Sequence, residues 1–184
     1  MAKAVVVLAE GFEEVEAITV IDVLRRGGVE VVAASLDGAN QVTGAHGVKV
    51  TADSSFKAAA QSECDALVLP GGGTGTENLR RSHELAERLR SQKESGRLVC
   101  AICAAPTVLV DAGVLDPEQH VTCYPSCVMD LDRPSANVPV VADGNVITGQ
   151  APGSSLLFAL VILKALVGDK AAEKVARGMV TDVL

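Results

Sequence analysis

The sequence predicts an α/β fold built on a mostly parallel central sheet. Short apolar runs alternate with longer amphipathic segments along the chain, and strands separated by helices imply βαβ units with helices on both faces of the sheet. The length of 184 residues suits one domain, which we expect to span residues 1–184, because no linker, repeat or low-complexity tract interrupts it. Apolar residues make up 48% of the chain and aromatic residues 2%, so the core should consist of Val, Leu, Ile and Ala.

The N-terminal half should supply three strands of this sheet and a small hairpin. Residues 4–8, 29–35 and 66–69 are apolar runs typical of buried strands. An amphipathic helix is expected over residues 15–26, because its pattern stops at Gly27 and Gly28. Residues 41–51 have the pattern of a hairpin or edge pair, with Gly44 and Gly47 at its turn.

The C-terminal half continues the alternation. A charged helix is expected over residues 77–95, after a glycine run at 71–73. A strand should follow at 98–102, with a helix at 107–113 directly after it and then a polar stretch. The remaining predicted elements are strands at 138–142 and 145–148 and helices at 154–167 and 170–180.

Charge and targeting signals narrow the class of protein. The net charge of −7 argues against nucleic acid and anionic membranes as partners. The apolar runs at 4–9 and 156–163 end at charged residues, so we expect neither a signal peptide nor a membrane span. Five cysteines, an odd number, without a secretion signal indicate reduced thiols. We therefore expect a cytoplasmic protein.

Residues that can carry chemistry follow the predicted strands. In open α/β sheets, ligands bind beyond the carboxyl ends of the strands, near a change in strand order. We therefore expect one edge of the sheet to bring together the carboxylates of residues 10–16, the glycine-rich loops at 70–75 and 149–155, and the thiol of Cys103.

Cys103 occupies the junction between the strand at 98–102 and the helix that follows. Ala104, Ala105 and Pro106 are small or favour a first helical turn, so the cysteine side chain should project from a tight corner. Backbone N–H groups and the helix dipole at such a corner favour a thiolate with a lowered pKa, as in the nucleophile elbow of α/β-hydrolases. The position alone leaves open the alternative of a small buried hydrophobic residue.

The carboxylates and the glycine loop also allow more than one interpretation. Glu13 and Glu14 stand at a helix start, where negative charge is stabilised without any catalytic role. Glu16 lies further in, and a carboxyl near a thiolate on a dry rim should have a raised pKa and donate a hydrogen bond to sulfur. The loop at 71–75 lacks the Lys-Ser/Thr of a P-loop, so it suits an oxyanion hole or a plain tight turn better than a nucleotide.

Metal binding and redox pairing are rival uses of the cysteines. The chain contains enough potential ligands for a four-coordinate zinc ion: Cys100, Cys103, His120, Cys123 and Cys127. Cys100, however, falls inside an apolar strand, whereas structural zinc sites use polar knuckles and thioredoxin-like cysteines share a helix start. We therefore predict no metal site, no bound cofactor and no particular role for the cysteines other than Cys103.

Motifs along essentially the whole chain resemble the DJ-1/PfpI superfamily, and within it the DJ-1 subgroup. Each motif alone is moderately specific, but their order and spacing together are highly specific. They are LAEGFEEVEA at residues 8–17, DVLRRGG at 22–28, LVLPGG at 67–72, AICAAPTVL at 101–109, DGNVIT at 143–148 and APGSS at 151–155.

This resemblance implies a flavodoxin-like three-layer sandwich, a homodimer, and Cys103 as the reactive cysteine. It makes Glu16 the carboxyl that hydrogen-bonds the sulfur, and it places the backbone of Gly71, Gly72 and Ala104 around an anion pocket. The resemblance implies further residues at the pocket border, namely Tyr124, Pro152, Gly153 and Arg26. Of these, Arg26 matches a family arginine near the dimer contact.

Three positions depart from relatives in the superfamily. Protease-like members have a histidine directly after the cysteine, where this chain has Ala104, so we do not expect peptide hydrolysis. Tyr124 replaces a histidine that some relatives carry, and His46 replaces an arginine. Glu16 is then the one evident acid–base partner for Cys103.

The resemblance and the site residues together lead to two hypotheses of function. The first is a cysteine-dependent, cofactor-independent glyoxalase or deglycase-like enzyme that acts on 2-oxoaldehydes such as methylglyoxal, by thiol addition at Cys103 and proton transfer by Glu16. The second is a non-catalytic redox sensor or redox-regulated chaperone, in which Cys103 is oxidised to a sulfinate that a protonated Glu16 stabilises. The same two residues serve both hypotheses, so the sequence does not separate them.

Overall fold

A computed structural model describes residues 1–183 and contains a seven-stranded sheet in the order β5-β2-β1-β6-β7-β9-β8. All neighbouring strands run parallel except the edge pair of β8 and β9. The mostly parallel sheet predicted from the sequence is therefore confirmed. The strands of this sheet are β1 (Lys3–Leu8), β2 (Glu30–Ser35), β5 (Ser54–Ser55), β6 (Ala66–Leu69), β7 (Leu98–Ile102), β8 (Val140–Asp143) and β9 (Val146–Gly149).

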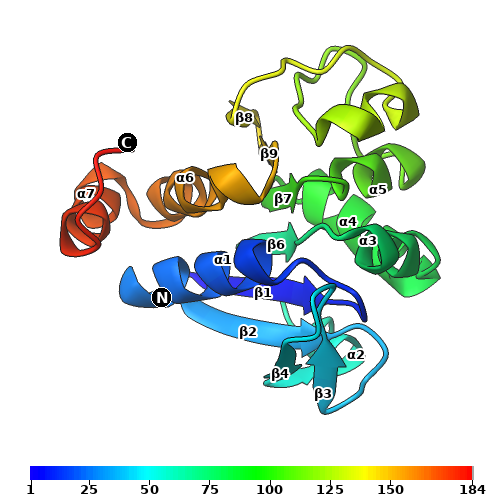
Figure 1. Ribbon diagram of the computed structural model, residues 1–184, viewed down its shortest axis with the longest axis horizontal. Coiled ribbons are helices and arrows are strands. Elements are labelled where there is room, and N and C mark those ends of the chain that lie inside the picture. Colours follow the sequence, from blue (N-terminus) through cyan, green and yellow to red (C-terminus); the bar gives the residue numbers. More distant parts are fainter. Residues whose placement is uncertain (184) are drawn as a thin grey trace.

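Helices cover both faces of the sheet and make it the middle of three layers (Figure 1). One face is covered by α1 (Glu14–Arg26) and α6 (Ser155–Val167), and α7 (Asp169–Gly178) packs against α6. The other face packs against α2 (Phe56–Ala59), α3 (Gly73–Arg80), α4 (His83–Glu94) and α5 (Pro106–Asp111).

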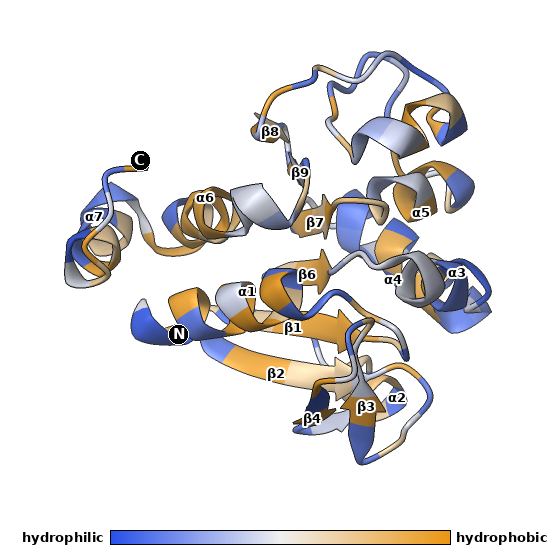
Figure 2. Cartoon of the chain, viewed as in Figure 1, coloured by the Kyte–Doolittle hydropathy of each residue, from blue (hydrophilic) through white to orange (hydrophobic). Residues whose placement is uncertain are grey.

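Alternation along β1 explains why both faces are buried. Val6 and Leu8 belong to the core on the side of α1 and α6, whereas Val5 and Val7 belong to the core on the side of α2 to α5. Successive strand side chains point to opposite faces, so an apolar run without polar alternation needs cover on both sides. Figure 2 accordingly shows β1, β6 and α6 as predominantly hydrophobic.

A small hairpin projects beside the main sheet, as the sequence predicts. Strands β3 (Gln41–Thr43) and β4 (Lys49–Thr51) pair antiparallel and form a separate two-stranded sheet. Two 3-10 helices complete the described elements: η1 (Pro125–Asp130) within the polar stretch after α5, and η2 (Pro152–Ser154) directly before α6.

The single helix predicted over residues 77–95 is wrong, because this segment forms two helices. Helix α3 ends at Arg80, and α4 begins after Ser82, whose side chain accepts a hydrogen bond from the Leu85 N–H at 3.2 Å. A serine cap of this kind satisfies a free N–H group of a new helix. The short elements β5 and α2 were not predicted either, since two to four residues carry too little periodicity to identify them.

Strand order determines where the loops meet. Strand β1 lies between β2 and β6, so the chain passes to one side of β1 first and crosses to the other side later. Such a switch point leaves a crevice beyond the carboxyl ends of the central strands. The segments that leave β1, β6 and β7 at this edge contain Glu16, Gly71 and Cys103. Within residues 1–183, no helix has the length and apolar character needed to cross a lipid bilayer.

Candidate active site

Cys103 sits at a strained corner between β7 and α5. Its backbone φ is +66°, a left-handed conformation that residues with a side chain adopt rarely. Two hydrogen bonds hold the corner: the Cys103 N–H donates to the Gly149 carbonyl at 3.0 Å, and the Cys103 carbonyl accepts from the Tyr124 N–H at 2.7 Å. Strain that neighbouring segments maintain in this way is common at functional sites.

Glu16 reaches the same position from the first turn of α1. Its side chain is fully buried, and Oε2 accepts a hydrogen bond from the Gly71 N–H at 2.7 Å. The second oxygen, Oε1, has no well-aligned partner among residues 1–183. The Cys103 thiol nevertheless lies near enough to the carboxyl that a hydrogen bond between them changes the pKa of both groups.

Gly71 allows these two side chains to approach one another. A Cβ atom at this position would lie 2.7 Å from Cys103 Cβ and 2.8 Å from Glu16 Oε2. Gly72 is restricted by backbone instead, since its φ is +90° and a Cβ would lie 2.4 Å from the Gly11 carbonyl oxygen. The glycine loop therefore lets Cys103, Glu16 and the backbone of Gly11 lie close to it, in addition to forming a tight turn.

Burial dominates the electrostatics of Glu16. Loss of solvation raises the pKa of its carboxyl to about 7, although the hydrogen bonds from Gly71 and Cys103 act in the opposite direction. The charge of Glu13 raises this pKa further. Glu16 consequently exchanges its proton near neutral pH, as a group that donates and accepts protons must.

The expectation of a lowered thiol pKa is wrong. Burial, followed by the charge of Glu16 and the hydrogen bond with it, raises the pKa of Cys103 to about 12. Hydrogen bonds from the Ala104 and Gly72 N–H groups favour the thiolate but do not outweigh burial at a side chain that is 8% exposed. The resting thiol is thus protonated, and it needs a base in order to react.

The three backbone groups assigned to the anion pocket divide into two roles. The N–H groups of Gly72 and Ala104 face the sulfur, so they are placed to stabilise negative charge at or beside it. The N–H group of Gly71 is already bound to Glu16. Gly71 therefore positions the carboxyl, while Gly72 and Ala104 remain the candidates for an oxyanion hole.

The residues assigned to the pocket border lie in different places. Tyr124 is bound to Cys103 through its backbone and leaves its side chain partly exposed. Pro152 and Gly153 belong to η2, just after Gly149, which accepts the Cys103 N–H. Their contact with a ligand stays a prediction.

Arg26 does not border this pocket, and its assignment there is wrong. It ends α1, ten residues after Glu16, which corresponds to about 15 Å along the helix. Its guanidinium pairs with Asp22 at 2.6 Å. Arg26 instead lines a separate hollow of about 490 Å³ between the C-terminal end of α1 and helix α7.

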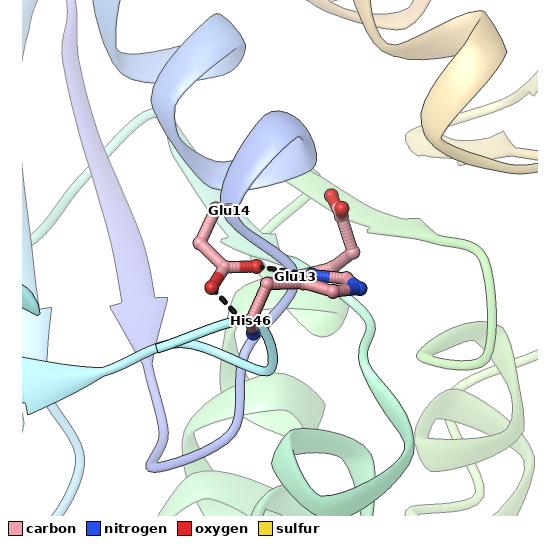
Figure 3. Close-up of side chains that lie close together, drawn as sticks. All are labelled: Glu13, Glu14 and His46. Atoms are coloured by element: carbon pink, nitrogen blue, oxygen red, sulfur yellow. Dashed lines mark hydrogen bonds and ion pairs between the residues drawn. The ribbon is translucent and has the colours of Figure 1, made fainter. Parts of the chain in front are cut away.

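Glu13, Glu14 and His46 form a cluster beside the start of α1 (Figure 3). Glu13 caps the helix by accepting the Glu16 N–H at 2.8 Å. Glu14 accepts the His46 N–H at 2.6 Å and contacts His46 Nδ1 at 2.8 Å, so it ties the β3–β4 hairpin to α1. The contact lowers the pKa of Glu14 and raises that of His46. No local pattern in the sequence indicates this long-range contact.

The same cluster is the group among residues 1–183 that could hold a metal ion. One potential ligand atom from each residue lies within 4.8 Å of the others. Both oxygens of Glu14 already interact with the hairpin, however, and Glu13 is engaged in capping α1. The cysteine and histidine ligands considered for zinc are not brought together within this described part of the chain.

A thiol and a buried carboxyl at the switch point of a flavodoxin-like sheet define a class of α/β proteins with a cysteine elbow. The chain belongs to the DJ-1/PfpI family, whose sequence model matches residues 2–165. This result agrees with the resemblance found in the sequence motifs.

Individual relatives match nearly the whole chain. Protein dj-1beta of Drosophila melanogaster is 41% identical over 179 residues, covering 96% of this chain and 95% of the relative. The Parkinson disease protein 7 homolog of Danio rerio is 38% identical and covers 94% of each chain. The glutathione-independent glyoxalase DJR-1.2 of Caenorhabditis elegans is 34% identical, covering 88% of this chain and 86% of that protein.

Solved structures have the same fold. The crystal structure of Drosophila melanogaster DJ-1beta superposes with a TM-score of 0.94 at 39% identity and covers 98% of both chains. The structure of oxidized Toxoplasma gondii DJ-1 also gives 0.94, at 33% identity, covering 98% of this chain and 99% of that one.

Replacing Gly71 tests the close approach at the site. In Gly71→Ala, the new methyl group must displace Cys103 or Glu16, so we expect the free energy of unfolding to fall by about 1–3 kcal/mol, the usual cost of overpacking. Urea denaturation followed by circular dichroism measures this. Gly73→Ala is the matched control, because a Cβ there meets no atom within 4 Å. Equal stability of the two variants would contradict the proposed packing.

Proposed function

We propose that this protein is a cysteine-dependent, cofactor-independent glyoxalase. Its substrates would be 2-oxoaldehydes such as methylglyoxal, and its role would be protection against carbonyl and oxidative stress. The observation that carries the proposal is the buried Glu16 carboxyl, whose pKa burial raises to about 7 and which lies beside the Cys103 side chain at Gly71. The name of the Caenorhabditis elegans relative, a glutathione-independent glyoxalase, also supports it.

The first step would be base-assisted addition of sulfur to the aldehyde. Ionised Glu16 accepts the proton of the Cys103 thiol while the sulfur bonds to the aldehyde carbon. The carbonyl oxygen becomes negatively charged in this step, and the N–H groups of Gly72 and Ala104 are placed to stabilise it. Glu16 then returns the proton to that oxygen and yields a hemithioacetal.

The following steps would move a proton between two neighbouring carbons. Glu16 removes the hydrogen of the former aldehyde carbon to give an enediol, and protonation of the adjacent carbon then produces a thioester of Cys103. Water cleaves the thioester, which releases lactate and restores the thiol. The substrate is rearranged and hydrated without net oxidation, so these reaction steps need no redox cofactor. A deglycase-like activity would use the same two residues on a glycated amine.

A non-catalytic role in oxidation sensing is the second candidate, with or without chaperone activity. Glu16 can be neutral near pH 7, so its proton could form a charge-assisted hydrogen bond to a Cys103 sulfinate. The oxidized form of the Toxoplasma gondii relative favours this candidate. Selective oxidation of Cys103 by peroxide, without lactate production from methylglyoxal, would support it over the enzyme.

We also propose that the protein acts as a cytoplasmic homodimer. Exposed apolar side chains occur on α1 at Val15 and Ile18 and on the hairpin at Val48. Glu14 accepts the Val48 N–H at 3.4 Å, which places the hairpin residue beside α1. Exposed apolar groups gathered on adjoining elements are typical of an interface.

Light scattering tests the dimer. At micromolar concentration we expect a mass twice that of the 18.9 kDa chain. Val15→Asp should shift the mass toward the single-chain value, because a buried unpaired charge disfavours association. A single-chain mass for the unaltered protein would contradict the dimer.

Glu16→Gln tests the proposed proton transfer. Glutamine keeps the shape and can still accept the Gly71 N–H, but it cannot take a proton from the thiol. We therefore expect D-lactate production from methylglyoxal to fall by about 10²-fold or more, and Cys103→Ser to abolish it.

Asp22→Asn is the matched carboxyl-to-amide control, since Asp22 lies on the same helix and pairs with Arg26 at the surface. It should retain full turnover. A correctly folded Glu16→Gln protein with undiminished turnover would remove this residue from the mechanism.

A further inference from the structure

Two fully buried threonines lie on the two segments that hold the cysteine corner. Thr148 is the third residue of β9 and pairs with Ala101 of the neighbouring strand β7. Thr122 belongs to the segment after α5 and lies two residues before Tyr124. Neither threonine has any exposed surface. A buried hydroxyl group is costly unless it forms hydrogen bonds, so the partners of these two groups indicate what each contributes.

The Thr148 hydroxyl joins the two segments. Its oxygen accepts the N–H of Thr122 at 2.9 Å. The Thr122 hydroxyl makes a different contact, because it donates to the Val138 carbonyl at 2.8 Å. Thr148 therefore attaches residue 122 to the sheet, whereas the side chain of Thr122 attaches the same residue to the chain that precedes β8.

Both hydrogen bonds that hold Cys103 lie next to this junction. Gly149, which accepts the Cys103 N–H at 3.0 Å, is the residue after Thr148. Tyr124, whose N–H donates to the Cys103 carbonyl at 2.7 Å, lies two residues after Thr122. The bond between Thr148 and Thr122 thus fixes the spacing of the two groups that hold the peptides on either side of Cys103.

A left-handed residue with a side chain depends on support of this kind. Cys103 has a φ of +66°, and such conformations persist only where the surrounding structure determines them in more than one way. Without the Thr148 hydroxyl, the buried N–H of Thr122 has no acceptor, and the segment must shift to find one. The shift would draw the Tyr124 N–H away from the Cys103 carbonyl, and the relaxed corner would move the sulfur away from Glu16.

We propose that Thr148 is a positioning residue, whose hydroxyl group keeps the Cys103 sulfur in its reactive place by fixing residues 122–124 against β9. Thr148 acts through the backbone of the corner. The inference rests on the proposed role of Cys103 as the reactive thiol, but it does not require that the reaction be that of a glyoxalase.

Thr148→Val tests the proposal, because valine keeps the branched shape of threonine and lacks the oxygen that accepts the Thr122 N–H. We expect the rate constant for alkylation of Cys103 by iodoacetamide at neutral pH, measured by mass mapping, to fall about tenfold or more, since a misplacement of about 1 Å can cost about 10²-fold in rate.

Turnover of methylglyoxal provides a second readout. In Thr148→Val, kcat for D-lactate production should fall while KM stays unchanged, because the substitution alters the placement of the sulfur and not the binding of the aldehyde. If the unaltered protein produces no lactate, the glyoxalase proposal fails, and the alkylation rate still tests the position of Cys103.

Two further variants separate positioning from a general loss of packing. Thr148→Ser retains the hydroxyl and should restore the alkylation rate of the unaltered protein. Thr122→Val is the matched control, because it removes the other buried hydroxyl but keeps the N–H that Thr148 accepts. It should lower the midpoint of urea denaturation as Thr148→Val does, without slowing alkylation of Cys103.

If Thr148→Val does not fold, Thr148→Ser and Thr148→Ala form a second pair that differs only in the hydroxyl, and the serine variant should react faster. A folded Thr148→Val protein that reacts as fast as the unaltered one, or faster, would overturn the proposal. An equal loss of rate in Thr122→Val, or no recovery in Thr148→Ser, would reduce Thr148 to a packing role and overturn it as well.

Discussion

The burial of one carboxyl group against one thiol is the constraint on which this structure depends. Glu16 has no exposed surface, and its one well-aligned hydrogen bond comes from the Gly71 N–H. Desolvation disfavours the ionised form, and this effect, with a smaller contribution from the charge of Glu13, raises the pKa of the carboxyl to about 7, where it can exchange a proton with Cys103. The neighbouring features serve that contact, because Gly71 has no side chain to separate the two groups and Glu13 caps the helix that carries Glu16.

The fold supplies this contact from parts that are distant in sequence. Helix α1 with Glu16 follows strand β1, the glycine loop follows β6, and the strained corner at Cys103 follows β7. These strands are neighbours in the order β1-β6-β7, so their carboxyl ends meet at one edge. The corner also depends on β9 and on the segment after α5, which contribute the hydrogen bonds of Gly149 and Tyr124. Loss of either hydrogen bond would relax the left-handed backbone conformation of Cys103 without removing any group that contacts its sulfur.

Much of this arrangement can be predicted from the sequence, because strand runs and strand-to-helix corners are local patterns. The strands at residues 66–69 and 98–102, the hairpin and the corner at Cys103 all follow from apolar periodicity and small residues. The break at Ser82 is not predictable in this way, since the charged pattern continues through it. Properties that depend on tertiary contact were predicted less well. The thiol pKa was expected to fall because N–H groups face the sulfur, but burial and Glu16 outweigh them. The pairing of Glu14 with His46 joins residues 32 positions apart, and no local pattern encodes it.

The protonation of Glu16 is the central claim, and a titration of its carboxyl tests it most directly. Carbon-13 NMR of protein labelled at glutamate carboxyls would follow the chemical shift with pH, with the Glu16→Gln variant identifying the resonance. The account predicts a midpoint at about pH 7, well above the ordinary glutamate value of 4.5. It also predicts a higher midpoint in Cys103→Ala, because removal of the thiol removes a hydrogen bond that favours the carboxylate. A midpoint near 4.5 in the folded protein would show that Glu16 is permanently ionised at neutral pH, and it would contradict the account.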